Sequence, residues 1–191
     1  LKWARENGLL LDTLFNCNCY GDKAISAELA DFADATLAEM DREGLYPDIV
    51  TTTSPFLATI FRRRHPNVKI RLSVNMRVHG TAGFEPVIEL FDSFYASREH
   101  HRDLNWLKDL SRWAKANGKI VGMQANSGCL RQCAFQQFHD NMHGHNRIAQ
   151  SAEGAKMDFS VFLCKTNYER GNYEDFLRST WIRPEDLPLY E

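Results

Sequence analysis

The cysteines carry the clearest candidate chemistry in this sequence. There are five, at positions 17, 19, 129, 133 and 164. No export signal precedes them, so reduced thiols that bind metal or react are expected rather than a disulfide framework. If Cys129 to Cys133 forms a helical turn, the two Cβ atoms lie about 5–6 Å apart, whereas a disulfide needs roughly 3.8 Å. This spacing favours two thiolates that bind different irons of one cluster.

A 4Fe-4S cluster requires four ligands. Cys129, Cys133 and Cys164 supply three of them, and either Cys17 or Cys19 supplies the fourth. Cys19 is the predicted ligand because it lies further from the preceding strand, where the loop can turn inward. A radical-SAM pattern would need a further cysteine at position 136, which is a glutamine, so that class is not favoured.

The histidines after this loop offer a second interpretation. On a helix, His139 and His143 share one face, which suits zinc if Cys129 and Cys133 or a carboxylate such as Asp140 completes the site. A zinc-dependent hydrolase or peptidase is therefore an alternative. A third is a non-catalytic module in which the cysteines hold a structural metal for binding a partner. Without any metal, the same histidines are ordinary hydrogen-bonded side chains.

Polar residues that follow other strands are the candidate substrate contacts. Arg98 would anchor an anionic substrate group, and Glu99 or His139 would move protons. The alternative for the segment beginning at Ser97 is a helix cap. Further substrate-binding candidates after other strands are Asn75, Arg77 and Asn126.

Short apolar runs that alternate with amphipathic segments must position these residues. Strands are expected at 9–15, 48–53, 68–76, 91–97, 119–125 and 159–164, and helices at 26–42, 55–64 and 104–116. This order predicts an α/β fold with a parallel sheet. The repeat of Trp3-Ala4 and Asn7-Gly8 as Trp113-Ala114 and Asn117-Gly118 favours a TIM-like (β/α) barrel. Loops at the carboxyl ends of its strands would bring all five cysteines to one rim.

Composition limits the remaining possibilities. The chain of 191 residues is expected to form a single domain over 1–191, and it is shorter than the about 250 residues of a complete barrel. We therefore expect an incomplete barrel and a fragment of a longer chain. A formal net charge of -2 excludes nucleic-acid binding by bulk electrostatics. No apolar run approaches the roughly 20 residues that span a bilayer, and the first residues lack a signal-peptide pattern, so a cytoplasmic protein is expected.

Several short motifs resemble the collagenase-like peptidase family U32. The strand 91–95 that runs into Ser97-Arg98-Glu99 is similar to a strand-to-helix step of that family. Three further segments resemble it: Ser73-Val74-Asn75, Asn126-Ser127-Gly128-Cys129 with Cys133, and Trp181 to Asp186. The segment before Cys129 and the cysteine spacing differ from the better-known family signature.

This resemblance implies a barrel protein that holds a 4Fe-4S cluster. Relatives of this kind support oxygen-independent hydroxylation of an RNA base or a quinone precursor, so the resemblance implies a small-molecule or RNA substrate and an electron donor protein. Peptidase activity is not favoured, because no Ser-His-Asp, Cys-His or zincin arrangement is present in the sequence.

Overall fold

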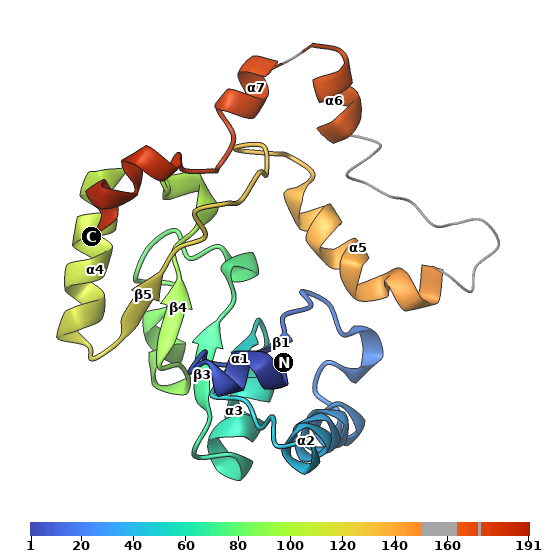
Figure 1. The fold of residues 1–191 in the computed structure, drawn as a ribbon. Helices are drawn as coiled ribbons and strands as arrows, with labels where there is room; N and C mark the ends of the chain where they lie inside the picture. Colours follow the sequence, from blue (N-terminus) through green and yellow to red (C-terminus); the bar gives the residue numbers. More distant parts are fainter. Residues whose placement is uncertain (150–163, 172) are drawn as a thin grey trace.

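The core of the fold is one parallel β-sheet. The computed structural model describes residues 1–149, 164–171 and 173–191. Its five strands lie in the order β1-β2-β3-β4-β5, so each strand pairs with the next one in the chain (Figure 1). The strands are β1 Asp12–Phe15, β2 Ile49–Thr52, β3 Lys69–Leu72, β4 Ser93–Tyr95 and β5 Ile120–Gly122. The sheet is not closed within the described residues, so the predicted α/β fold and incomplete barrel are confirmed.

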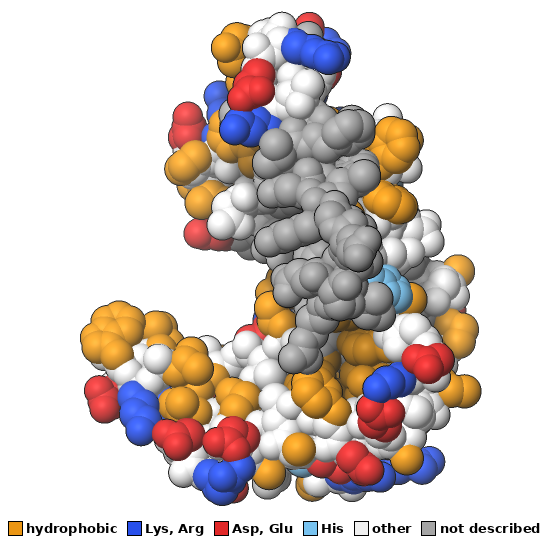
Figure 2. Space-filling model, turned by 90° about the vertical axis from the view of Figure 1, so that its right-hand side faces the viewer, with side chains coloured by type: hydrophobic (Ala, Val, Ile, Leu, Met, Phe, Trp, Pro, Cys, Tyr) orange, Lys and Arg blue, Asp and Glu red, His pale blue; other side chains and the backbone are white. Residues whose placement is uncertain are grey.

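Helices follow the strands. The α-helices are α1 Lys2–Glu6, α2 Ala27–Arg42, α3 Pro55–Arg64, α4 Leu104–Ala116, α5 Gln136–Ala149, α6 Thr166–Glu169 and α7 Tyr173–Leu177. Short 3-10 helices are η1 Gly21–Lys23, η2 Val74–Met76, η3 Glu85–Leu90, η4 Arg98–His100 and η6 Pro184–Tyr190. In Figure 2 the molecule is hollowed between its upper part, where α6 and α7 lie, and its lower part.

Local capping explains why the three longest predicted helices begin where they do. The side chains of Ser26, Ser54 and Asp103 each accept a hydrogen bond from the backbone N–H three residues later. This contact satisfies an N–H group that has no partner inside the helix. Pro55 occupies the first turn of α3, where its missing N–H costs nothing. The predicted ranges 55–64 and 104–116 are therefore matched by α3 and α4.

The two faces of the sheet differ in chemistry. On the face covered by helices, Val50, Ile70 and Phe94 are fully buried. The alternate positions of the strands carry polar groups. Arg71 Nη1 donates to Asp12 Oδ2 at 3.1 Å and to the Tyr95 hydroxyl at 3.0 Å. Because successive side chains of a strand point to opposite faces, these polar residues lie on the side that forms the interior of a closed barrel.

The strands are shorter than predicted, and β3 shows why. The expected strand 68–76 stops at Leu72 because the Ser73 side chain accepts a hydrogen bond from Asn75 N–H and starts η2. Most of the expected strand 159–164 lies outside the described residues, apart from Cys164. Among the described residues, no helix is both long and apolar enough to span a membrane.

Candidate functional site at the strand ends

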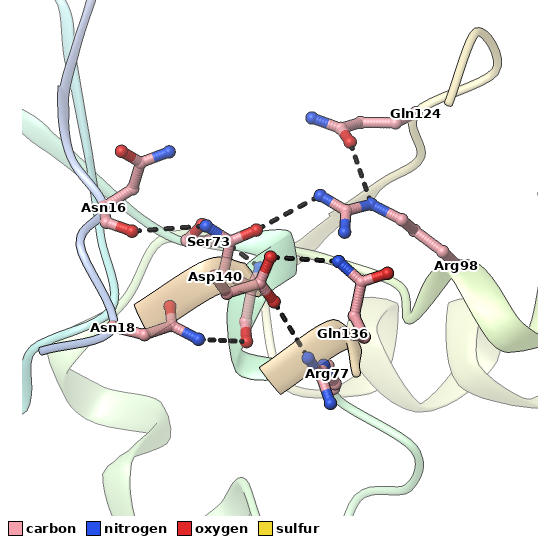
Figure 3. A network of polar contacts seen from close by, with 9 residues as sticks. Asn16, Asn18, Ser73, Arg77, Arg98, Gln124, Gln136 and Asp140 are labelled. Atoms are coloured by element: carbon pink, nitrogen blue, oxygen red, sulfur yellow. Dashed lines mark hydrogen bonds and ion pairs between the residues drawn. The ribbon is translucent and has the colours of Figure 1, made fainter. Parts of the chain in front are cut away.

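A network of amide and guanidinium groups joins the carboxyl ends of several strands (Figure 3). Asn75, in η2 after β3, donates from Nδ2 to Asn16 O at 3.2 Å. The backbone carbonyl oxygen of Asn75 accepts a hydrogen bond from Asn18 Nδ2 at 3.3 Å. Arg98 then donates from Nη2 to Asn75 Oδ1 at 3.1 Å and from Nε to Gln124 Oε1 at 3.4 Å. The structure thus brings together Asn75 and Arg98, which the sequence predicted separately.

Helix α5 is tied to the same rim by an ion pair. Arg77 Nη2 donates to Asp140 Oδ2 at 2.9 Å, and Gln136 Nε2 donates to Asp140 Oδ1 at 3.0 Å (Figure 3). The Asp140 side chain is only 9% exposed, whereas that of Arg77 is 29% exposed. Arg77 is therefore already paired with a carboxylate, and an anionic substrate would have to compete with Asp140 for it.

The backbone conformation of Arg77 helps to direct its own side chain toward Asp140. Arg77 follows η2 with a φ of 51°, in the left-handed region that non-glycine residues rarely adopt. The turn is held from the other end by Ser73, which is buried and accepts from Asn75 N–H. A local turn thus directs Asn75 and Arg77 to two different partners.

Glu99 has a structural partner in the cysteine loop. Its Oε2 accepts a hydrogen bond from Gln132 N at 2.7 Å, and Gln132 adopts a left-handed φ of 55°. The segment from Cys129 to Cys133 is therefore a loop with a turn, and the assumption of a helical turn is wrong for this segment. The reason is tertiary, because a carboxylate from η4 captures an N–H that a helical turn would direct along its own axis.

The remaining predicted site residues are spread around this rim. His139 lies in α5, with its backbone N–H bonded to Phe135 O at 2.9 Å. His143 is in the same helix, but its side chain lies outside the described part of the chain. Asn126 is exposed in the turn after β5. The roles predicted for Glu99, His139 and Asn126 stay predictions.

The space between these side chains is nearly filled. The cavity at the centre of the rim has a volume of about 10 Å³, which is at the lower limit for a single water molecule. Its walls come from β-strand ends, η4, the cysteine loop and α5, namely Val74, Arg77, Ser97, Arg98, Glu99, Cys129 and Gln136. This small cavity has no room for a substrate, so a substrate would have to approach the half-buried Arg98 and Glu99 from outside it.

The five cysteines are all free thiols, and they form two groups. The three-cysteine group consists of Cys129, Cys133 and Cys164. Burial raises the pKa of the half-buried Cys164 thiol, and the neighbouring Cys133 and Cys129 raise this pKa further. Burial also raises the pKa of the Tyr168 hydroxyl, and Cys164 and Cys129 raise it further. Two segments far apart in sequence thus meet at these thiols.

Cys17 and Cys19 form the second group, which we call the cysteine pair. Burial and then Cys19 raise the pKa of the Cys17 thiol. The pair packs against the middle of α5, where a Cβ added to Gly144 would lie 2.8 Å from Cys19 O and 3.6 Å from Cys17 Cβ. Cys133 instead adjoins the first residue of α5, since its carbonyl accepts from Gln136 N at 3.1 Å. Eight residues of helix separate these two points, which is about 12 Å.

This separation bears on the proposed cofactor. Within the described residues, no three His, Cys, Asp or Glu side chains are grouped closely enough to hold a metal ion. The thiols of the three-cysteine group suit an iron–sulfur cluster in chemistry, because such clusters are held by cysteine thiolates that bind separate irons. Cys19, the fourth predicted ligand, lies with the other group, so the complete predicted ligand set is not assembled in this arrangement.

Several residues of the rim were absent from the sequence prediction. Asn16, Asn18, Gln124 and Gln136 all take part in the bonded network. Asp140 was considered only as a metal ligand. The spacing of Gln136 and Asp140 by four residues was a usable signal, because such residues are neighbours on a helix. Nothing in the sequence placed their helix face against Arg77.

Comparison with known proteins gives one informative result. No protein-family profile matches the sequence, and no curated protein matches it. Among solved structures, the U32 peptidase Mk0906 matches with a TM-score of 0.61 at 18% sequence identity. The match covers 82% of this chain and 60% of that one, so the chain spans less than two thirds of that protein's length. The chain therefore has a distant U32-like fold, as the sequence motifs predicted.

Proposed function

We propose that this chain is the sheet-forming part of a U32-like barrel enzyme that holds an iron–sulfur cluster at the three-cysteine group. The observation that supports the proposal is that Cys129 and Cys133, from a separate segment, are near enough to Cys164 to raise the pKa of its thiol. Thiols gathered at a strand-end rim match the usual place of catalytic groups in such folds. A bound cluster would supply one-electron chemistry.

In this proposal the chain's own residues bind and orient the substrate. Arg98 and Asn75 already exchange a hydrogen bond, and an anionic or amide-bearing substrate group could replace Asn75 as the acceptor for the Arg98 guanidinium. Arg77 and Asn126 are further proposed substrate contacts. Glu99 and His139 are the proposed proton carriers. Glu99 accepts the Gln132 N–H and thereby also holds the cysteine loop.

The proposed reaction is an oxygen-independent hydroxylation of a small molecule or an RNA in the cytoplasm, and an electron donor protein is a proposed partner. This part of the proposal rests on the U32 resemblance of the motifs. Peptidase activity receives no support from the described rim. There the Glu99 carboxylate accepts a backbone N–H, and the buried Ser97 hydroxyl has no hydrogen-bond partner among the described residues.

The metal content of anaerobically prepared protein tests the proposal. We expect a brown protein with iron and acid-labile sulfide in equal amounts, about four of each per chain. A colourless protein that remains free of iron after anaerobic reconstitution would overturn the cluster. Stoichiometric zinc without iron would instead support the zinc-dependent alternative built on Cys129, Cys133, His139 and His143. In that case, replacing both histidines by alanine should release the zinc.

A further inference from the structure

A large cavity borders the cysteine loop and shares no lining residue with the small cavity of the rim. Its volume is about 1130 Å³, and its walls are the loop 130–135, residue 102 and segments of α6 and α7 with their flanking residues. Helices α6 and α7 lie beyond the start of α5 (Figure 1). Basic and acidic side chains lie near one another on this upper part of the molecule (Figure 2). The cavity is large enough for an organic ligand, because typical ligand pockets measure about 300–1,000 Å³.

The charge of this cavity is strongly one-sided. Four arginines line it, namely Arg102, Arg131, Arg170 and Arg178, against the single carboxylate of Asp175. The whole chain has a formal net charge of -2, so the positive charge is a local concentration. Such a concentration inside a concave surface attracts anions more strongly than the same charges spread over a convex surface.

Two of the four arginines already have structural partners. Arg102 donates from Nη2 to the carbonyls of Leu177 at 3.1 Å and Trp181 at 3.0 Å. Arg178 pairs with Glu174 one turn earlier. Asp175 accepts a hydrogen bond from Asn167 Nδ2 at 3.0 Å. These contacts stabilise the wall of the cavity, and they pair the nearby carboxylates of Glu174 and Asp175 with other side chains.

Arg131 and Arg170 are different. Within the described part of the chain, neither guanidinium forms an ion pair with a carboxylate. The backbone next to Arg131 is held by Glu99, whose Oε2 accepts from Gln132 N at 2.7 Å, and Gln132 has a left-handed φ. An exposed arginine on a convex surface would merely be solvated, but these two border one shared cavity.

We propose that this cavity binds a small phosphate monoester, with its phosphate between Arg131 and Arg170. A guanidinium group matches two phosphate oxygens at once, and two such groups balance the charge of a monoester, which approaches -2 at neutral pH. A phosphodiester carries only one negative charge and is matched less well. The apolar wall formed by Leu130, Ala134 and Phe135 would contact the organic part of the ligand.

The cavity is also placed to serve the three-cysteine group, since Cys133 forms part of its wall. If the proposed cluster exists, the phosphate ester is thus a candidate substrate or effector for it. Phosphate binding itself requires no metal, and so the two proposals can fail separately.

Calorimetric titration of the purified protein tests the phosphate site. The probes are adenosine 5′-monophosphate, adenosine, inorganic phosphate, and a single-stranded oligoribonucleotide without a terminal phosphate. We expect the monophosphate to bind at least tenfold more tightly than adenosine and more tightly than the oligoribonucleotide. Inorganic phosphate should compete with it. Equal binding of monophosphate and adenosine would overturn the proposal, as would tighter binding of the oligoribonucleotide.

Two matched double variants locate the site. Arg131→Gln with Arg170→Gln should weaken monophosphate binding at least tenfold. Arg42→Gln with Arg63→Gln removes the same charge from helices α2 and α3, away from the cavity, and should leave binding unchanged. Equal losses in both variants would show non-specific attraction and overturn the site. The same titration before and after iron removal separates this result from that of the proposed cluster, and circular dichroism checks that each variant is folded.

Discussion

The cysteine pair and the three-cysteine group lie at two different points along α5, and they are built in different ways. Cys17 and Cys19 follow β1 within one loop, so their proximity is set by local sequence. Cys164 meets Cys129 and Cys133 only through the tertiary fold, across a segment of about 30 residues. Nearness in sequence therefore does not identify the thiols that form the larger group.

Helix α5 is the element that keeps the two groups apart. Its first residue adjoins Cys133, its Asp140 is bonded to Arg77, and its Gly144 packs on the cysteine pair. Since a helix rises 1.5 Å per residue, the distance between the groups is set by its length. Substitutions of the thiols and of the residues that hold α5 therefore test whether the two groups are separate sites.

The largest expected effect is on iron binding. Cys129→Ser, Cys133→Ser and Cys164→Ser should each reduce the iron content of anaerobically prepared protein to background, because each removes a thiolate of the proposed cluster site. Cys17→Ser and Cys19→Ser should retain the iron, since their loop lies about 12 Å further along α5. Loss of iron in Cys19→Ser alone of these two would instead identify Cys19 as the fourth ligand, and α5 would then have to shift.

The next largest effect concerns the attachment of α5 to the rim. Asp140→Asn should lower the free energy of unfolding by about 1.5–3 kcal/mol, because it leaves the partly buried Arg77 without its charged acceptor. The matched control is Asp109→Asn, which breaks the exposed pair with Arg112 and should cost about 0–1 kcal/mol. Urea unfolding measures both. Similar losses in the two variants would mean that the Arg77–Asp140 contact does not anchor α5.

A smaller effect is expected at Gly144. Gly144→Ala places a Cβ 2.8 Å from Cys19 O, so α5 or the loop of the cysteine pair must shift. Overpacking of this kind costs about 1–3 kcal/mol, and the gain in helix propensity returns up to about 1 kcal/mol. We therefore expect a net loss of about 1 kcal/mol and faster alkylation of Cys17.

The control for this variant is Gly83→Ala. Gly83 has an ordinary φ and no atom within 4 Å of an added Cβ, so alanine is accommodated there. Its unfolding free energy should stay the same or rise slightly. Stabilisation by Gly144→Ala would show that the close contact with the cysteine pair can relax without cost.

The smallest effect is confined to high pH. Burial and then Cys17 raise the pKa of Tyr20 to about 12, while an unfolded tyrosine titrates near 10. The stability that this shift provides is present below about pH 10 and is lost as the pH rises toward 12. Between pH 9 and 11 the wild type should lose about 1 kcal/mol more than Tyr20→Phe in urea unfolding. Equal losses would place the Tyr20 hydroxyl in water, away from the cysteine pair.

Local sequence was sufficient to predict the repeating elements. Apolar runs and caps such as Ser54 and Asp103 act within a few residues, so they predicted α3 and α4 at their observed bounds. The rule that polar residues gather at strand ends also placed Asn75 and Arg98 on one rim, where they are bonded. These features follow from periodicity and hydrogen bonding between near neighbours, which do not depend on the rest of the fold.

Only the tertiary structure decided how the rim is completed. The packing of α5 pairs Arg77 with Asp140, and the Glu99 contact with Gln132 turns the cysteine loop away from a helix. The same packing places Cys19 and Cys133 at different points along α5, and it gathers Arg131 and Arg170 around one cavity. These contacts join residues that are tens of positions apart, and their geometry depends on how whole elements pack. The periodic pattern of residue types in the sequence does not determine how these elements pack against one another.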